Sequence, residues 1–113
     1  MYKLLDIYRE EYKDGRYSGH IVYLNIDQPI DVELPIGVWN KSIIVSSLIR
    51  SKYSQDSVEA LVNNHLLLLA EWQDKIFNGE NPGKLVDPEY DELQEWRKLC
   101  KQWADEALEK FPE

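Results

Sequence analysis

The chain of 113 residues has few of the side chains that metal sites and disulfides require. It contains one cysteine, Cys100, and two histidines, His20 and His65. Structural zinc needs four convergent ligands, so these three side chains do not make a zinc site. A lone cysteine forms no internal disulfide, and nothing in the sequence indicates an oxidising compartment. We therefore expect no metal, no other cofactor and a cytoplasmic location.

Long apolar runs are also absent. The longest is Leu66–Ala70, at five residues, whereas a membrane-spanning helix needs about 20. The N-terminus reaches Lys3 and Asp6 too early for a signal peptide. The five glycines are scattered and make no phosphate-binding pattern. We expect no contact with a membrane.

Basic residues are in the minority, and the formal net charge is −8. Residues 1–40 hold four basic and seven acidic side chains, and residues 79–113 hold five basic and ten acidic ones. Nucleic-acid binding through phosphates depends on basic residues that displace counterions. The composition therefore argues against direct phosphate contact with a nucleic acid.

Residues 2–36 have the pattern of a small antiparallel meander. His20–Ile26 is rich in β-branched and aromatic residues, and Asp31–Leu34 alternates polar and apolar side chains and ends at Pro35. Tyr2–Tyr12 is ambiguous between strand and helix. We interpret it as a strand, because Asp14-Gly15 favours a hairpin and two strands alone are marginally stable.

Three helices are expected after the meander. Asn40–Tyr53 carries pairs of apolar and of polar residues that repeat every four positions, which is a helical period, and Asn40 or Ser42 can serve as its N-cap. A long helix is expected over Gln55–Asn78, with Ser54 as its N-cap. Another is expected over Pro88–Phe111 behind Asp87, because proline is favoured at the first helical position.

The two long helices would each span about 36 Å, whereas a compact chain of this length has a radius of gyration of about 13 Å. We therefore expect them to run antiparallel and to pack largely on each other. The broad apolar face of the first long helix is expected to point to the core: Val58, Leu61, Val62, His65, Leu66, Leu69, Trp72 and Ile76. The prediction is one α+β domain over residues 1–113, with a three-stranded antiparallel meander (1–39) and a helical part (40–113) of one short and two long helices.

Candidate catalytic groups are sparse. Cys100 lies between Trp96 and Trp103 on the apolar stripe of the last helix, where a buried thiol acts as a small hydrophobic side chain. The alternative is a nucleophile paired with His65, but no oxyanion-stabilising glycine turn accompanies the pair. No serine lies in a nucleophile-elbow sequence. We expect a protein that is not an enzyme.

Aromatic residues are abundant, with four tryptophans and seven tyrosines. The tryptophans are expected to fill the core. A three-stranded sheet can place only one face against helices, so several N-terminal tyrosines are expected near solvent. Such rings are favoured at protein interfaces. The predicted partner-binding residues are Tyr2, Tyr8, Tyr12 and Tyr17.

The segment Ile43–Leu61 resembles part of a family of small uncharacterised proteins of bacterial phages and prophages. In that family the segment lies between a short β-rich N-terminus and a charged C-terminal helix. The resemblance implies the same layout here and an accessory role in a phage or mobile element. No activity is attached to the family, so the resemblance implies no site residue.

These observations predict a non-enzymatic protein–protein interaction or assembly protein. We expect it to bind a protein partner or to form a homo-oligomer. One alternative is an acidic inhibitor that mimics nucleic acid with the solvated face of the last helix, at Glu89, Glu92 and Glu95. Another is a small-molecule-binding domain, whose signature would be an apolar pocket between the sheet and the helices.

Overall fold

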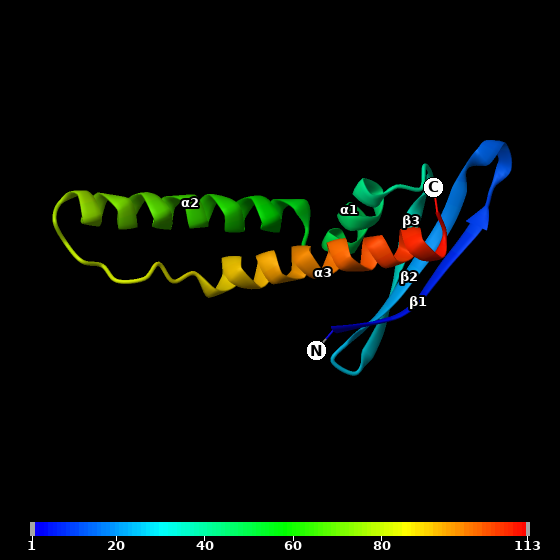
Figure 1. Cartoon of the computed structure of the whole chain (residues 1–113), viewed down its shortest axis with the longest axis horizontal. Coiled ribbons are helices and arrows are strands. Elements are labelled where there is room, and N and C mark those ends of the chain that lie inside the picture. Colours follow the sequence, from blue (N-terminus) through cyan, green and yellow to red (C-terminus); the bar gives the residue numbers. More distant parts are fainter. Residues whose placement is uncertain (1, 113) are drawn as a thin grey trace.

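The computed structural model describes residues 2–112. Its strands are β1 (Tyr2–Glu11), β2 (Tyr17–Asn25) and β3 (Gln28–Gly37), and its α-helices are α1 (Lys41–Lys52), α2 (Gln55–Phe77) and α3 (Pro88–Lys110). The strands form one antiparallel sheet in the order β1-β2-β3, and the helices follow it in the chain (Figure 1). The predicted α+β fold, with one short and two long helices, is confirmed.

The ambiguous segment at the N-terminus is a strand. In the β1–β2 pairing, Ile7 lies opposite Ile21, and both are buried, whereas Tyr8 lies opposite His20 on the other face. Period-two alternation thus places one set of side chains in the core. A 3₁₀ turn at Lys13–Gly15 closes the hairpin, with both Asp14 and Gly15 at positive φ. Because asparagine, aspartate and glycine tolerate that conformation best, the Asp14-Gly15 signal was informative.

The second and third strands are longer than the sequence indicated. β2 begins at Tyr17 and not at His20, and β3 begins at Gln28 and not at Asp31. The prediction ended the third strand at Pro35, but β3 continues to Gly37 and also contains Pro29. Proline lacks an N–H and is tolerated in a strand that has a neighbour on one side only. In this sheet β3 pairs only with β2, so Pro35 does not end the strand.

The helix starts are placed by the predicted side-chain caps. The side chains of Asn40, Ser54 and Asp87 each accept a hydrogen bond from the backbone N–H three residues further on. Each cap satisfies a donor that the first turn of a helix leaves free, which stabilises the helix by about 1 kcal/mol. The helix boundaries predicted from the sequence therefore hold to within one or two residues.

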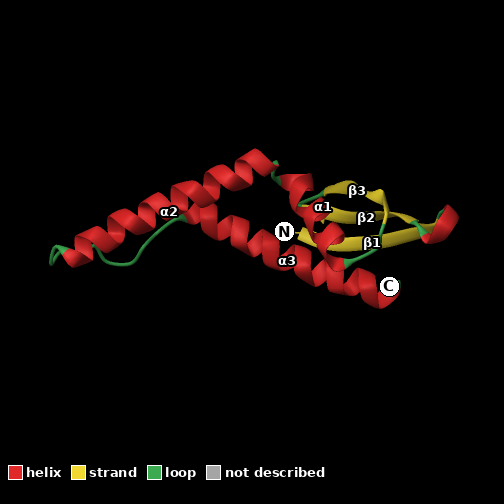
Figure 2. Ribbon diagram, turned by 90° about the horizontal axis from the view of Figure 1, so that it is seen from above, coloured by secondary structure: helices red, strands yellow, loops and turns green. Residues whose placement is uncertain are grey.

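The core lies between the sheet and two of the helices. α1 and α3 pack against each other and cover one face of the sheet, α1 over β3 and α3 over β1 (Figure 2). Small side chains on α3 let α1 approach closely, and large ones fill the space above the sheet. The buried residues of α3 are Leu93, Trp96, Cys100, Trp103, Ala104 and Ala107.

The overall shape contradicts the expectation of a compact pair of long helices. The molecule measures 62 × 32 × 23 Å, and its radius of gyration is 18.2 Å. α2 leaves the body beside the end of α1 and extends away from the sheet, and α3 begins only about halfway back along it (Figures 1 and 2). The long helices are antiparallel but contact each other over a short stretch. They do not pack largely on each other, because most of the apolar side chains of α3 pack on α1 and the sheet.

Candidate interaction surface

The helix α2 has no buried residue along its 23 positions, although it carries the longest apolar run in the chain. Leu66 is 56% exposed, Ile76 is 48% exposed and Phe77 is 90% exposed. Leu67 and Leu68 are exposed as well. The prediction that this apolar face points into the core is therefore wrong. A contiguous exposed apolar surface marks an interaction site, whereas single scattered apolar residues on a surface do not.

Two neighbouring apolar seams run along α2, each with alternating spacings of three and four residues. The covered seam consists of Val58, Leu61, His65, Leu68 and Trp72; His65 and Trp72 contact the start of α3 and the segment before it, and all members are partly buried except Leu68, which is 39% exposed. The exposed seam lies beside it and consists of Val62, Leu66, Leu69, Gln73 and Ile76, of which Leu66, Gln73 and Ile76 are exposed and Val62 and Leu69 are half-buried. An apolar arc of this width is more than a single partner helix can cover.

The covered seam is fixed to the start of α3 by His65. Its Nδ1 lies 3.0 Å from the carboxylate of Asp87, and its ring stacks on Tyr90 with the ring centroids 3.6 Å apart. Both side chains of the hydrogen-bonded pair are mostly shielded from solvent. Asp87 is also the N-cap of α3, so one carboxylate joins the two helices and sets where α3 begins.

Beyond this point the chain itself covers part of α2. The residues between α2 and α3 run back alongside the helix (Figure 1), and the Trp72 indole N–H donates a 2.7 Å hydrogen bond to the Gly83 carbonyl. Trp72 therefore anchors the returning segment and is not a core residue, unlike the three tryptophans at 39, 96 and 103. The far half of α2 lies beside an irregular segment where an ordinary helical hairpin would place a second helix.

The four predicted tyrosines do not share one surface. Tyr8 and Tyr12 are exposed, as expected for rings near solvent. Tyr2 and Tyr17 are partly buried and pack against the core: Tyr2 lies 4.8 Å from the Trp96 ring, measured between centroids. The guanidinium of Arg9 lies 4.1 Å from the centroid of the Tyr17 ring.

The outer face of the sheet carries Tyr8 in a polar setting. A hydrogen bond between Tyr8 and the Asp6 carboxylate raises the pKa of Tyr8, and the same bond lowers the pKa of Asp6. Next to Tyr8 on this face, His20 forms a 3.0 Å hydrogen bond with Asp31. This face is therefore mixed in polarity and presents less continuous apolar area than α2 does.

The predicted acidic residues Glu89, Glu92 and Glu95 are all exposed on α3. Glu92 forms a 3.1 Å ion pair with Lys52, and Lys98 joins both Glu92 and Glu95 in lining one pocket. The row of carboxylates is thus interrupted by two ammonium groups. A nucleic-acid mimic needs an unbroken series of negative charges, so this arrangement suits that role poorly.

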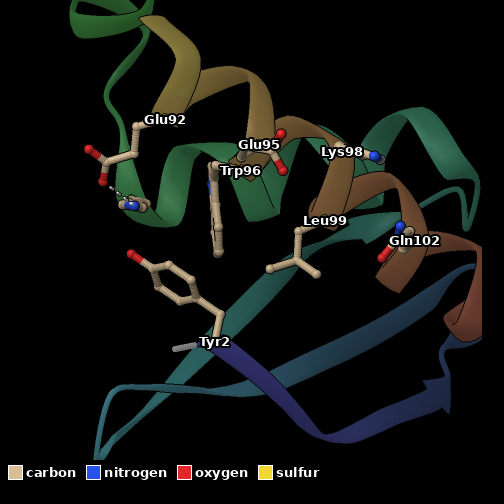
Figure 3. A pocket seen from close by; sticks show the side chains of 8 residues that line it. Tyr2, Glu92, Glu95, Trp96, Lys98, Leu99 and Gln102 are labelled. Atoms are coloured by element: carbon tan, nitrogen blue, oxygen red, sulfur yellow. Dashed lines mark hydrogen bonds and ion pairs between the residues drawn. The ribbon is translucent and has the colours of Figure 1, made fainter. Parts of the chain in front are cut away.

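The pocket next to these residues has a volume of about 290 Å³ and lies between the start of β1, the end of α1 and α3 (Figure 3). Tyr2, Trp96 and Leu99 give it an apolar wall, and charged side chains surround them. The Lys52 ammonium lies 4.6 Å from the Tyr2 ring centroid and 5.3 Å from that of Trp96. Burial alone would lower the pKa of Lys52, but its interactions with Tyr2 and Glu92 outweigh burial and raise it to about 12.

Cys100 has the properties of a core side chain. It is fully buried, and burial raises the pKa of its thiol to about 12, which keeps the nucleophilic thiolate scarce at neutral pH. His65 pairs with Asp87, three turns before Cys100 along α3, so the alternative Cys100–His65 dyad does not form. Within residues 2–112, no group of three or more histidine, cysteine or acidic side chains could hold a metal ion.

No helix within the described residues is both long enough and apolar enough to cross a bilayer. Comparisons with protein-family models, with curated proteins and with solved structures returned no match. The function is therefore inferred from the geometry of the molecule.

Proposed function

We propose that this chain is a non-enzymatic protein–protein interaction or assembly protein, and that α2 is its binding element. The observation that supports the proposal most strongly is a 23-residue helix with no buried side chain and a row of exposed leucines. A helix with little packing is marginally stable in water, and exposed apolar area disfavours the unbound state. A partner that covers the exposed seam would remove both costs. A phage or prophage origin belongs to the same proposal and rests on the resemblance of residues 43–61.

The proposal is tested by Leu66→Lys, with Asn64→Lys as the matched control. Both residues are exposed on the same helix, but they point in directions about 160° apart. Immobilised wild-type chain and the Asn64→Lys variant are expected to retain the same proteins from a lysate of the source cells, and Leu66→Lys is expected to lose them. Retention that is unaffected by Leu66→Lys but lost in Tyr8→Ala would place the binding surface on the sheet instead.

A small-molecule-binding role is the second candidate function. The pocket of about 290 Å³ lies between the start of the sheet and the helices α1 and α3, the place expected for a ligand site of this kind. One of its walls is Trp96, whose buried indole N–H has no hydrogen-bond acceptor among the described residues. An unsatisfied buried donor costs about 1–3 kcal/mol, and a ligand with a carbonyl or carboxylate oxygen would offset that cost if a turn of the indole ring exposed its nitrogen, which is closed off from solvent here, to the pocket.

This second role is tested by thermal unfolding in the presence of a metabolite library, with Trp96→Phe as the comparison. A carbonyl or carboxylate compound that stabilises the wild type and not the variant would support it. A library without any stabilising compound would leave the interaction function as the better account.

A further inference from the structure

We infer that the exposed seam of α2 binds the same seam of a second copy of this chain, in an antiparallel pair related by a twofold axis. The inference rests on the proposed interaction function and names the partner. Alternating spacings of three and four residues are the pattern by which helices pack along their length. α2 has two such seams, and its own chain covers one of them. With a second copy, both seams of α2 would be covered, one by its own chain and the other by α2 of the second copy.

The charge along α2 favours a second copy as the occupant. Residues 60–70 contain no lysine, arginine, aspartate or glutamate, although the whole chain has a formal charge of −8. Two copies of such an acidic chain repel each other over most of their surface. The middle of α2 is where two copies can meet without bringing like charges together, and it is also where Leu66 and Leu69 lie. A basic partner would need acidic residues in the same place, and this stretch has none.

The available area covers more than half of the apolar part of a standard interface. Such an interface buries about 800 Å² on each partner, and about 60% of that area is apolar, which makes about 480 Å². Phe77 lies on the same face as the exposed seam, one turn after Gln73, and is 90% exposed, whereas Leu66 is 56% and Ile76 is 48% exposed. When an exposed aliphatic side chain is taken as about 100 Å² and an aromatic one as about 200 Å², these three residues supply about 300 Å² per chain.

The direction of the pair follows from Glu59, which lies on the line of the exposed seam one turn before Val62. A parallel pair would place the two Glu59 carboxylates at the same level. An antiparallel pair centred near Leu69 separates them by about 30 Å, because each lies ten residues from the centre. The antiparallel arrangement also places the N-terminal end of each helix dipole beside the C-terminal end of the other, and this interaction is favourable. The two sheets then lie at opposite ends of the assembly.

The test is the molar mass of the full chain by size-exclusion chromatography with light scattering, over a hundredfold range of concentration. Wild type and Asn64→Lys are expected to give twice the mass of the 13.4 kDa chain at high concentration. Leu66→Lys is expected to raise the dimer dissociation constant on the order of 100-fold or more, because each dimer loses two buried leucines. Phe77→Lys serves as a second variant, and the circular dichroism of each variant checks that α2 still folds.

The outcomes separate this inference from the function on which it rests. A dimer that dissociates in Leu66→Lys but not in Asn64→Lys supports the second copy. A wild type that stays monomeric at every concentration overturns it, and the interaction function then stands only if protein capture still depends on Leu66. A dimer insensitive to both Leu66→Lys and Phe77→Lys also overturns it. If neither mass nor capture depends on α2, both the inference and the proposed function fail.

Discussion

Removal of the His65 side chain should detach α2 from α3 without unfolding the body of the protein. His65→Ala deletes the 3.0 Å hydrogen bond to Asp87 and the ring stacking on Tyr90. A hydrogen bond to a charged group contributes about 1.5–3 kcal/mol, and an aromatic stack contributes about 0.5–1.5 kcal/mol. The attachment of α2 should weaken by about 2–4 kcal/mol. The core formed by the sheet, α1 and α3 contains no α2 residue, so its stability should change little.

Hydrogen exchange measured by mass spectrometry distinguishes local from global opening. A detached helix is marginally stable, so amides of α2 should exchange about 30 to 1,000 times faster in His65→Ala, at a concentration where the chain is monomeric. Amides of β2 should keep their wild-type rates. Asn64→Ala, one residue away and exposed, is the control and should leave both sets unchanged. Unchanged exchange in α2, or an equal acceleration in α2 and β2, would show that His65 does not hold α2 to α3.

Three further predictions concern the body of the protein. Gly19→Ala should destabilise the fold by about 1–3 kcal/mol in denaturant titrations, because an added Cβ would lie 2.7 Å from the Trp39 ring and 2.9 Å from a backbone oxygen of β1; a gain in stability would show that the strands can shift. The Cys100 thiol, whose pKa burial raises to about 12, should resist a thiol reagent at pH 7 until the protein is denatured, and rapid labelling of the folded chain would contradict its burial. Lys52→Met should lower stability by about 1 kcal/mol, through loss of the Glu92 ion pair and the aromatic contacts. Because the folded-state pKa of Lys52 is raised from 10.5 to about 12, this difference should be constant below pH 10.5 and should shrink as the pH rises through 12, which urea titrations at several pH values would measure.

Local signals in the sequence were sufficient for the elements and their order. The caps at Asn40, Ser54 and Asp87 act over three residues, and so the helix starts could be read directly from the sequence. The strand nature of residues 2–11 was harder to predict, because helical and extended patterns both fitted the segment. The Asp14-Gly15 turn signal decided correctly, since it too is a local preference.

The candidate surface on α2 could not be predicted from neighbouring residues, because it depends on contacts between distant parts of the chain. An apolar stripe on a helix indicates that the stripe packs against another surface. It does not indicate whether that surface belongs to the same chain or to a partner. Residues such as Leu66 and Ile76 were therefore assigned to the core, and the four N-terminal tyrosines to a single docking surface. Two signals in the sequence pointed the other way: the unusual width of the apolar arc and the absence of charge in residues 60–70.

Capping, turn formation and periodicity are properties of neighbouring residues, and they therefore placed the helix starts to within one or two residues, whereas β2 and β3 each begin three residues earlier than the patterns indicated. Which apolar faces meet depends on packing between distant parts of the chain. α3 has one continuous apolar stripe, and packing it on α1 and the sheet leaves only its first turns for α2. That competition between partners for one helix face leaves α2 extended from the body, with its exposed seam uncovered.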